Sequence, residues 1–167
     1  MQNPAPREIP IAEHPVLRPV AETDDAFLRT LYRSTREAEL AGVPWPDAQK
    51  AAFCDMQFNA QRAGYRQTFP DAEHVLICAA GGEPAGRFIK ARQDGALRLV
   101  DIALLPAYRG RGWGSTIIES LQHEAAALNV ALCLSVEKHS PALALYQRLG
   151  FSITGDQDFR FTMAWKP

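Results

Sequence analysis

The chain has 167 residues, the size of one domain, and its 47% hydrophobic and 22% charged residues are typical of a compact globular protein. A formal net charge of -1 gives no overall positive field, so we expect no nucleic-acid partner and no attraction to acidic membrane surfaces. No apolar run reaches the ~18–20 residues of a membrane span. The cysteines Cys54, Cys78 and Cys133 are odd in number and far apart, which argues against disulfides and favours a reducing, cytoplasmic location.

Residues 1–14 contain several prolines and no continuous apolar stretch, so we expect a flexible tail before a single domain at residues 15–167. In that domain, apolar residues alternate or recur at helical spacing between Pro and Gly residues. The predicted order is β-α-α-β-β-β-α-β-α-β-β, with strands at 16–20, 73–80, 83–92, 96–105, 131–136, 151–154 and 159–165 and helices at 23–41, 46–64, 112–128 and 141–149.

Local signals mark the ends of several elements. Thr23 and Ser140 suit the positions that cap the first and fourth helices, and Asn129 suits a left-handed cap after the third. The dipeptide Gly81-Gly82 predicts a tight hairpin in which both glycines take positive φ. The second helix is expected to bury one apolar stripe, made of Ala52, Phe53, Met56 and Ala60.

The most informative segment is the Arg/Gly loop between the strand at 96–105 and the third helix. Gly110, Gly112 and Gly114 let backbone N–H groups approach a ligand closely. Arg109 and Arg111 add positive charge beside the free N–H donors of the first helical turn. Such a loop suits a phosphate or pyrophosphate, although a tight turn with two solvated arginines has the same composition.

Two common phosphate-binding motifs do not match this loop. No Lys precedes Ser115, as a Walker A loop requires, and the glycine spacing differs from G-x-G-x-x-G. A dinucleotide-binding fold remains an alternative, because Glu137 lies near the end of the next strand, where an acid can bind a ribose hydroxyl. Against it, the remaining chain lacks a second βαβαβ half.

A second motif, Ala142-x-x-x-Tyr146-x-x-x-Gly150-Phe151, lies one strand and one helix start after the loop. It resembles the second cofactor motif of the GNAT N-acetyltransferase superfamily, and Arg109-x-x-Gly112-x-Gly114 resembles that superfamily's pyrophosphate motif. The resemblance runs from about residue 73 to residue 165. It implies an α/β (α+β) fold of three layers, with a central mixed sheet of about seven strands and four helices.

The resemblance also implies that acetyl-CoA binds where the strands at 96–105 and 131–136 splay apart. Because Pro106 cannot extend a ladder, the first of these strands is expected to end or bulge near Leu104 and Leu105, freeing N–H groups to stabilise an oxyanion. The implied cofactor-binding residues are Ile102, Ala103, Leu104, Arg109, Gly110, Arg111, Gly112, Trp113, Gly114, Ser115, His139, Ala142 and Tyr146. His139 departs from the Asn that is frequent at this place in the family.

Tyr146 lies where the family places the general acid that protonates the departing thiolate, although its apolar helix face also suits a core tyrosine. For the general base we expect Asp101, because an isolated charge in an apolar strand is costly to bury and suits a functional site. A structural ion pair of Asp101 with an arginine, Arg87, Arg92 or Arg98, is an equal alternative. Glu137 and His139 are weaker candidates for the base.

The predicted function is transfer of acetyl from acetyl-CoA to a primary amine of a small molecule or a protein, without a covalent enzyme intermediate. The alternative is a non-catalytic acyl-CoA-binding module of the same fold. No metal is expected, since the histidines lack ligand spacing, and dimerisation is common in the superfamily but unmarked here. Polar residues that could line an acceptor cleft, or simply face solvent, are Tyr32, Arg36, Glu39, Trp45, Gln61 and Tyr65.

Overall fold

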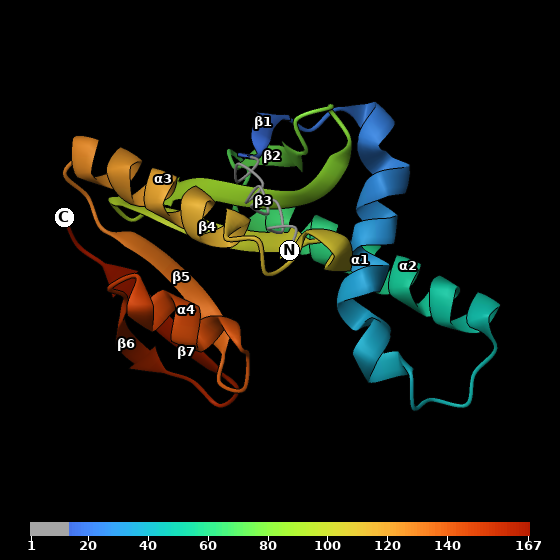
Figure 1. The fold of residues 1–167 in the computed structure, drawn as a ribbon. Helices are drawn as coiled ribbons and strands as arrows, with labels where there is room; N and C mark the ends of the chain where they lie inside the picture. The colour runs from blue at the N-terminus through green and yellow to red at the C-terminus, as the bar shows by residue number, and fades with distance from the viewer. Residues whose placement is uncertain (1–13) are drawn as a thin grey trace, which may run out of the picture.

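The computed structural model describes residues 14–167, so the tail predicted for residues 1–14 lies outside the described residues except for its last position. Seven strands and four α-helices follow one another in the predicted order (Figure 1). None of the helices in this part of the chain is both long and apolar enough to cross a lipid bilayer. The strands are β1 (Val16–Pro19), β2 (Glu73–Cys78), β3 (Pro84–Gln93), β4 (Ala96–Leu104), β5 (Leu132–Glu137), β6 (Ser152–Asp156) and β7 (Arg160–Trp165). The helices are α1 (Asp25–Leu40), α2 (Asp47–Thr68), α3 (Trp113–Ala127) and α4 (Ala142–Arg148).

The strands form one mixed sheet in the order β1-β2-β3-β4-β5-β7-β6. Neighbouring strands are antiparallel except for β4 and β5, which are parallel and are connected through α3. β4 therefore lies in the middle of the sheet, as its apolar sequence predicted. The mixed seven-stranded sheet with four helices confirms the predicted fold class.

Helices cover both faces of the sheet. Leu76 and Cys78 of β2 pack in a cluster with Leu28 of α1 and Phe58 of α2. Ile77, between them in the strand, belongs instead to the main core together with side chains of α3 and α4. Because successive side chains of a strand point to opposite faces, α1 and α2 lie on one face and α3 and α4 on the other. The fold thus has the three predicted layers (Figure 1).

The buried face of α2 differs from the predicted apolar stripe. Its buried residues are Cys54 and Phe58, whereas Met56 of the predicted stripe is 60% exposed. The guanidinium groups of Arg29 and Arg62 lie 5.3 and 5.1 Å from the centre of the Phe58 ring. Since arginines stack favourably on aromatic faces, part of the contact between α1 and α2 is made by charged side chains, which a search for apolar periodicity overlooks.

The predicted boundaries of the first two helices also shift. A 3₁₀ turn at Glu22–Asp24 precedes α1, so Thr23 lies inside that turn and is not the cap of the helix. Helix α2 continues past the predicted end at Gly64 to Thr68. A single glycine inside a helix costs only ~1 kcal/mol relative to Ala, which is too little to stop it.

Turn residues explain the remaining connections. In the β2–β3 hairpin Gly82 has φ +89° whereas Gly81 does not take positive φ, because the N–H of Gly82 closes a turn on the carbonyl of Ala79 at 2.9 Å. The prediction of two positive φ values was therefore wrong for Gly81. Asn129 takes φ +52° after α3, as predicted. Pro141 is the N-cap of α4, so Ser140, the predicted cap, lies one residue before the cap position, and its Oγ accepts the N–H of Ala142, the first residue of the helix, at 3.2 Å.

Candidate active site

The central feature of the site is a gap in the middle of the sheet, where β4 and β5 separate. Their parallel ladder has three residue pairs and ends at Leu99 opposite Leu134. The next residue of β4, Val100, is an extra residue relative to β3, and such a bulge bends a strand. β5 meanwhile stays paired with β7 as far as Glu137, so the two strands diverge (Figure 1).

The far end of β4 is set by its other neighbour, β3. β4 ends at Leu104, as the proline predicted, and Pro106 begins a 3₁₀ turn. The prediction that the N–H of Leu105 is freed was wrong, because it donates to the carbonyl of Ala85 at 2.8 Å. Gly86 of β3 lies opposite Leu104, and a Cβ at Gly86 would overlap the carbonyl oxygen of Ala103 and lie 2.7 Å from Leu104 Cδ2. The absence of a side chain at Gly86 therefore lets the end of β4 lie close to β3.

The Arg/Gly loop forms the predicted strand-to-helix turn. Gly110 and Gly112 have φ values of +73° and +83°, and a Cβ at either would meet no atom within 4 Å. The space above both glycines is thus open to a ligand. Gly112 is the N-cap of α3, and no side chain of the described residues caps this helix, so its N-terminal end suits the binding of an anion.

Two guanidinium groups flank this turn. Arg109 Nε donates to the carbonyl of Leu104 at 2.9 Å, which holds the arginine across the end of β4. The guanidinium of Arg111 lies 5.1 Å from the centre of the Tyr108 ring. Trp113 is 3% exposed and belongs to the main core. Open glycines, an uncapped helix start and two cations fit the pyrophosphate of a coenzyme A molecule.

A groove of about 260 Å³ runs from this turn along β4 to α4. The predicted cofactor residue His139 is exposed in the turn between β5 and α4 and does not line the groove. Ser115 lies in the first turn of α3. The groove is lined by several of the predicted cofactor residues, namely Ile102, Ala103, Leu104, Arg109, Gly114, Ala142 and Tyr146.

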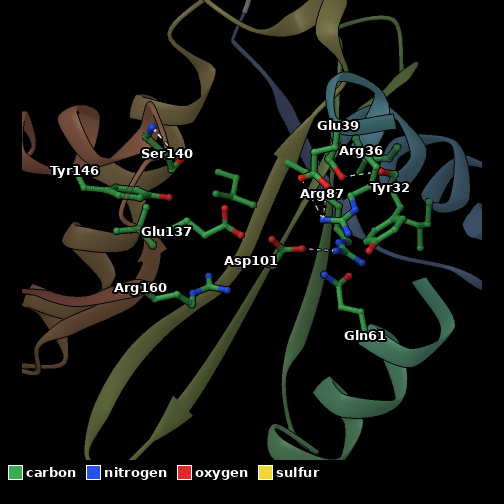
Figure 2. A pocket seen from close by; sticks show the side chains of 17 residues that line it. Tyr32, Arg36, Glu39, Gln61, Arg87, Asp101, Glu137, Ser140, Tyr146 and Arg160 are labelled. Carbon is green, nitrogen blue, oxygen red and sulfur yellow. Dashed lines mark hydrogen bonds and ion pairs between the residues drawn. The ribbon is translucent and has the colours of Figure 1, made fainter. Parts of the chain in front are cut away.

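A second cavity, of about 370 Å³, lies on the other side of the gap between α1 and α4 (Figure 2). Of the residues predicted to contact an acceptor, Tyr32, Arg36, Glu39 and Gln61 line it. Tyr65 lines a separate cavity of about 440 Å³, and burial raises its pKa to about 12. Trp45 lies in the α1–α2 loop, packed edge-on against Phe53. The structure therefore brings most, but not all, of the predicted acceptor residues together.

The groove and the second cavity meet at Tyr146. Both are lined by Tyr146, Ala142, Ile102 and Ala103. The Tyr146 ring is 6% exposed, and its hydroxyl points into the second cavity (Figure 2). Burial and the nearby Asp101 carboxylate raise the pKa of this hydroxyl to about 12. The group is thus protonated at neutral pH and suited to donate a proton.

Asp101 projects from β4 into the second cavity (Figure 2). Its Oδ2 accepts from Arg87 Nη2 at 2.5 Å, so of the three arginines considered as ion-pair partners the structure selects Arg87. Asp101 Oδ1 has no hydrogen bond to any other described residue. Glu137 lines the same cavity from the end of β5 and forms no ion pair with another described residue. Two carboxylates therefore face the point where the groove ends.

Several residues of this cavity were not predicted from the sequence, among them Arg160 and Thr35. Arg160 is the first residue of β7 and lies opposite Glu137, with its Nη2 donating to the carbonyl of Ser135 at 3.2 Å. In the sequence, the only indication that Arg160 belongs to the site is its position in the last predicted hairpin. Its pairing with Glu137 depends on a strand register that the sequence does not specify. Thr35 lies at the junction and lines both spaces.

Within residues 14–167 no group of three or more His, Cys, Asp or Glu side chains is placed to hold a metal ion.

Solved structures share the fold over nearly the whole chain. The PaiA N-acetyltransferase from Thermoplasma acidophilum, in complex with coenzyme A, is 16% identical with a TM-score of 0.70, and the match covers 92% of this chain and 99% of that one. An acetyltransferase from Thermus thermophilus is 20% identical with a TM-score of 0.67, covering 92% and 97%. A histone acetyltransferase and related acetyltransferase from Corynebacterium glutamicum is 21% identical with a TM-score of 0.62, covering 92% and 96%.

No curated protein sequence matches this chain. Residues 71–153 match the family model described as acetyltransferase (GNAT) domain. This segment begins just before β2 and ends in β6, so it contains the gap between β4 and β5, the Arg/Gly turn and Tyr146. Residues 71–153 are therefore a GNAT acetyltransferase domain, and the solved structures extend the likeness in fold to nearly the whole chain.

Proposed function

We propose that this enzyme transfers the acetyl group of acetyl-CoA directly to a primary amine, with both substrates bound at once and without a covalent enzyme intermediate. The observation that carries the proposal is the meeting of two cavities at Tyr146. One of them leads to the basic turn at the start of α3, and the other is lined by charged side chains. A donor and an acceptor bound in the two spaces would place their reacting atoms side by side.

The residues that would hold coenzyme A are those of the groove and the turn. The loop backbone at Gly110 and Gly112, with the guanidinium groups of Arg109 and Arg111, would bind the pyrophosphate. The β4 residues up to Leu104 present a strand side that β5 does not cover, so their backbone groups would bind the pantetheine chain. Bound acetyl-CoA supplies an acetyl group activated as a thioester.

Two side chains would move the protons. Asp101 Oδ1 accepts a proton from the attacking amine, while Arg87 holds the other carboxylate oxygen and so orients the group. The amine nitrogen forms a bond to the acetyl carbon as the carbon–sulfur bond breaks, its electron pair going to sulfur. Tyr146 then donates its hydroxyl proton to that sulfur, as suits a tyrosine whose pKa is raised to about 12.

The first test is the thermal unfolding of the purified protein with acetyl-CoA, with NAD and ATP as controls, followed by assays of CoA release with a panel of amines. At a 100-fold excess over Kd, binding adds ~2.7 kcal/mol, and we expect a rise in Tm of roughly 5–10 °C with acetyl-CoA alone. We also expect CoA release that depends on an amine. Stabilisation by acetyl-CoA without turnover of any amine would favour the non-catalytic module, and stabilisation by NAD alone would favour a dinucleotide-binding protein.

A further inference from the structure

The second cavity contains two arginines whose hydrogen-bonding capacity is only partly used. Arg87 is 8% exposed, and its Nη2 donates to Asp101. Arg36 of α1 donates to Gln57 Oε1 at 2.9 Å and to Glu39 Oε1 at 3.3 Å. The Nε–H groups of Arg36 and Arg87 are both buried and have no acceptor among the described residues. Buried donors without an acceptor are unfavourable, so the hydrogen-bonding capacity of these two arginines is not fully satisfied by the described residues.

The charges around the cavity are balanced. Three guanidinium groups and three carboxylates line it, so its formal charge is zero. A polyamine would bring several positive charges to this neutral cavity, and a polyanion would bring negative ones, in each case without compensation. A ligand that carries one charge of each sign leaves the balance intact. The lining groups are Arg36, Arg87, Arg160, Glu39, Asp101 and Glu137.

Two carboxylates and two arginines of the cavity lie toward different ends of it, although Arg87 also pairs with Asp101 and Arg36 with Glu39. Asp101 and Glu137 lie toward the Tyr146 hydroxyl, where the acetyl group would arrive (Figure 2). Arg36 and Arg87 lie on the side of the cavity nearer α1 (Figure 2). An acceptor whose ammonium group faces the carboxylates would therefore direct an attached carboxylate toward the arginines.

We propose that the acceptor is a zwitterionic amino carboxylate, such as a free amino acid, whose carboxylate is bound by Arg36 and Arg87. The inference rests on the acetyl transfer proposed above and adds the class of the acceptor. A cavity of about 370 Å³ lies at the small end of the range for small-molecule sites, which agrees with a ligand of this size. The reaction forms the N–C bond of an N-acetylamino acid, breaks the thioester C–S bond and releases the CoA thiol.

The test compares matched acceptors that differ only in the carboxylate. CoA release is measured with the free amino acids, with the corresponding amino acid amides, with spermidine and with a lysine-rich protein. We expect kcat/KM to be about 100-fold higher for the best amino acid than for its amide, because a site built to bind a charged group rejects the analogue that lacks it. Calorimetric titration should show binding of the N-acetylamino acid product and none of its amide, which gives a readout independent of turnover.

A pair of variants on α1 tests the role of Arg36. Arg36→Gln should raise KM for the preferred amino acid at least 10-fold and leave the acetyl-CoA-dependent rise in Tm unchanged. Arg33→Gln is the matched control, because Arg33 pairs with Asp55 at 2.7 Å and lines a different cavity. Its kinetic constants should equal those of the wild type.

The outcomes separate this inference from the proposed function. Equal or better turnover of the amides, spermidine or the lysine-rich protein would overturn the acceptor assignment and leave acetyl transfer intact. The assignment also fails if acetyl-CoA stabilises the protein but no amino acid is acetylated, or if Arg36→Gln does not change the discrimination between acid and amide. A protein that acetyl-CoA does not stabilise and that acetylates no amine would instead overturn the proposed function itself.

Discussion

The ring of Tyr146 packs edge-on against Phe151 in the main core, with ring centres 5.7 Å apart, while its hydroxyl faces the junction of the two cavities. The sequence left two interpretations of this residue, a core tyrosine and a proton donor. The structure supports a place in the core for the ring, and the orientation of the hydroxyl favours the chemical role. Burial serves that role, because it raises the pKa and keeps the hydroxyl protonated.

Tyr146→Phe removes the hydroxyl and preserves the ring. We expect kcat to fall about 10²–10³-fold, the range of a positioned acid, with the Kd for acetyl-CoA and the Tm nearly unchanged. Phe151→Leu is the matched control, since it disturbs the same ring contact, lowers Tm and leaves kcat within about threefold. Because the pKa of Tyr146 is about 12, the wild-type rate should show no loss from this group between pH 7 and 10. If the rate of Tyr146→Phe is close to that of the wild type, the hydroxyl has no catalytic role and Tyr146 contributes only to packing.

Among the secondary-structure elements, β4 decides the shape of the site. Its bulge at Val100 turns the strand away from β5, and its last residues, Ala103 and Leu104, are held close to β3 by the missing side chain at Gly86. The side of the gap that is proposed to bind the donor is therefore positioned by β3, a strand that does not itself line the groove.

Gly86→Ala tests this dependence. The new Cβ would overlap the backbone of β4, so we expect the free energy of unfolding to fall by about 1–3 kcal/mol and the Kd for acetyl-CoA to rise about 10-fold or more. Urea denaturation and calorimetry measure the two effects. In the control, Gly81→Ala, the added Cβ meets no atom within 4 Å and both quantities should stay at wild-type values. Equal behaviour of the two variants would show that the close approach at Gly86 is unimportant for the site.

The backbone features of the proposed donor side could be predicted from the sequence because residue type determines them over a short segment. Glycines at positive φ, a proline that ends a strand and an uncapped helix start are specified by residue type over a short segment, as at Pro106, Gly110 and Gly112. The acceptor side depends on side chains from separate elements. Arg160 meets Glu137 only through the register of β5 and β7, and sequence periodicity does not contain that register.

The same limit explains the error on α2. Residue hydrophobicity favoured a stripe that included Met56, whereas the helix buries Phe58 beneath arginines that belong to an ion-pair network with α1. The network links Asp25 to Arg29 and Arg62 at 2.8 and 2.6 Å. Charged residues that pair between two helices do not contribute to an apolar periodicity in the sequence. The buried face of α2 is therefore visible only in the three-dimensional arrangement.

On the scale of the whole molecule, the acceptor cavity depends on how α1 is fixed to the sheet. Arg18 of β1 forms a two-pronged ion pair with Asp24 just before α1, with both N–O distances at 2.8 Å. Asp24 also accepts the N–H of Ala21 at 2.7 Å, and its side chain is 7% exposed. These bonds connect the outermost strand to the helix that carries Tyr32 and Arg36. The hydrogen bonds from Arg18 and Ala21 lower the pKa of Asp24 to about 2.

Asp24→Asn should therefore destabilise the fold in a pH-dependent way. The folded-state pKa lies below the ordinary 3.8, so the ionised carboxylate stabilises the fold above about pH 4, and this contribution is lost as the pH falls toward 2. At pH 7 we expect the free energy of unfolding of the variant to be about 1–3 kcal/mol lower than that of the wild type. Urea titrations at lower pH should show this difference shrinking steadily below pH 4. Asp156→Asn, which removes a partner of Lys138 at an exposed position, should cost less than ~1 kcal/mol. If the loss of unfolding free energy in Asp24→Asn does not change with pH, the ionised carboxylate is not what stabilises the fold.

The gap between β4 and β5 also has a consequence for association with other chains. Beyond Leu99, β4 has one side without a strand partner, and an unpaired side of a strand normally invites addition of a strand from another protein. Such unpaired sides usually occur at the outer edges of a sheet, but here the unpaired side lies in the middle of the sheet and faces β5 (Figure 1). A strand of a folded neighbour would have to enter between β4 and β5 to pair there, whereas a narrow extended ligand needs less room. The side of β4 that is proposed to bind an extended ligand thus differs from the exposed sheet edges at which strands of other chains add.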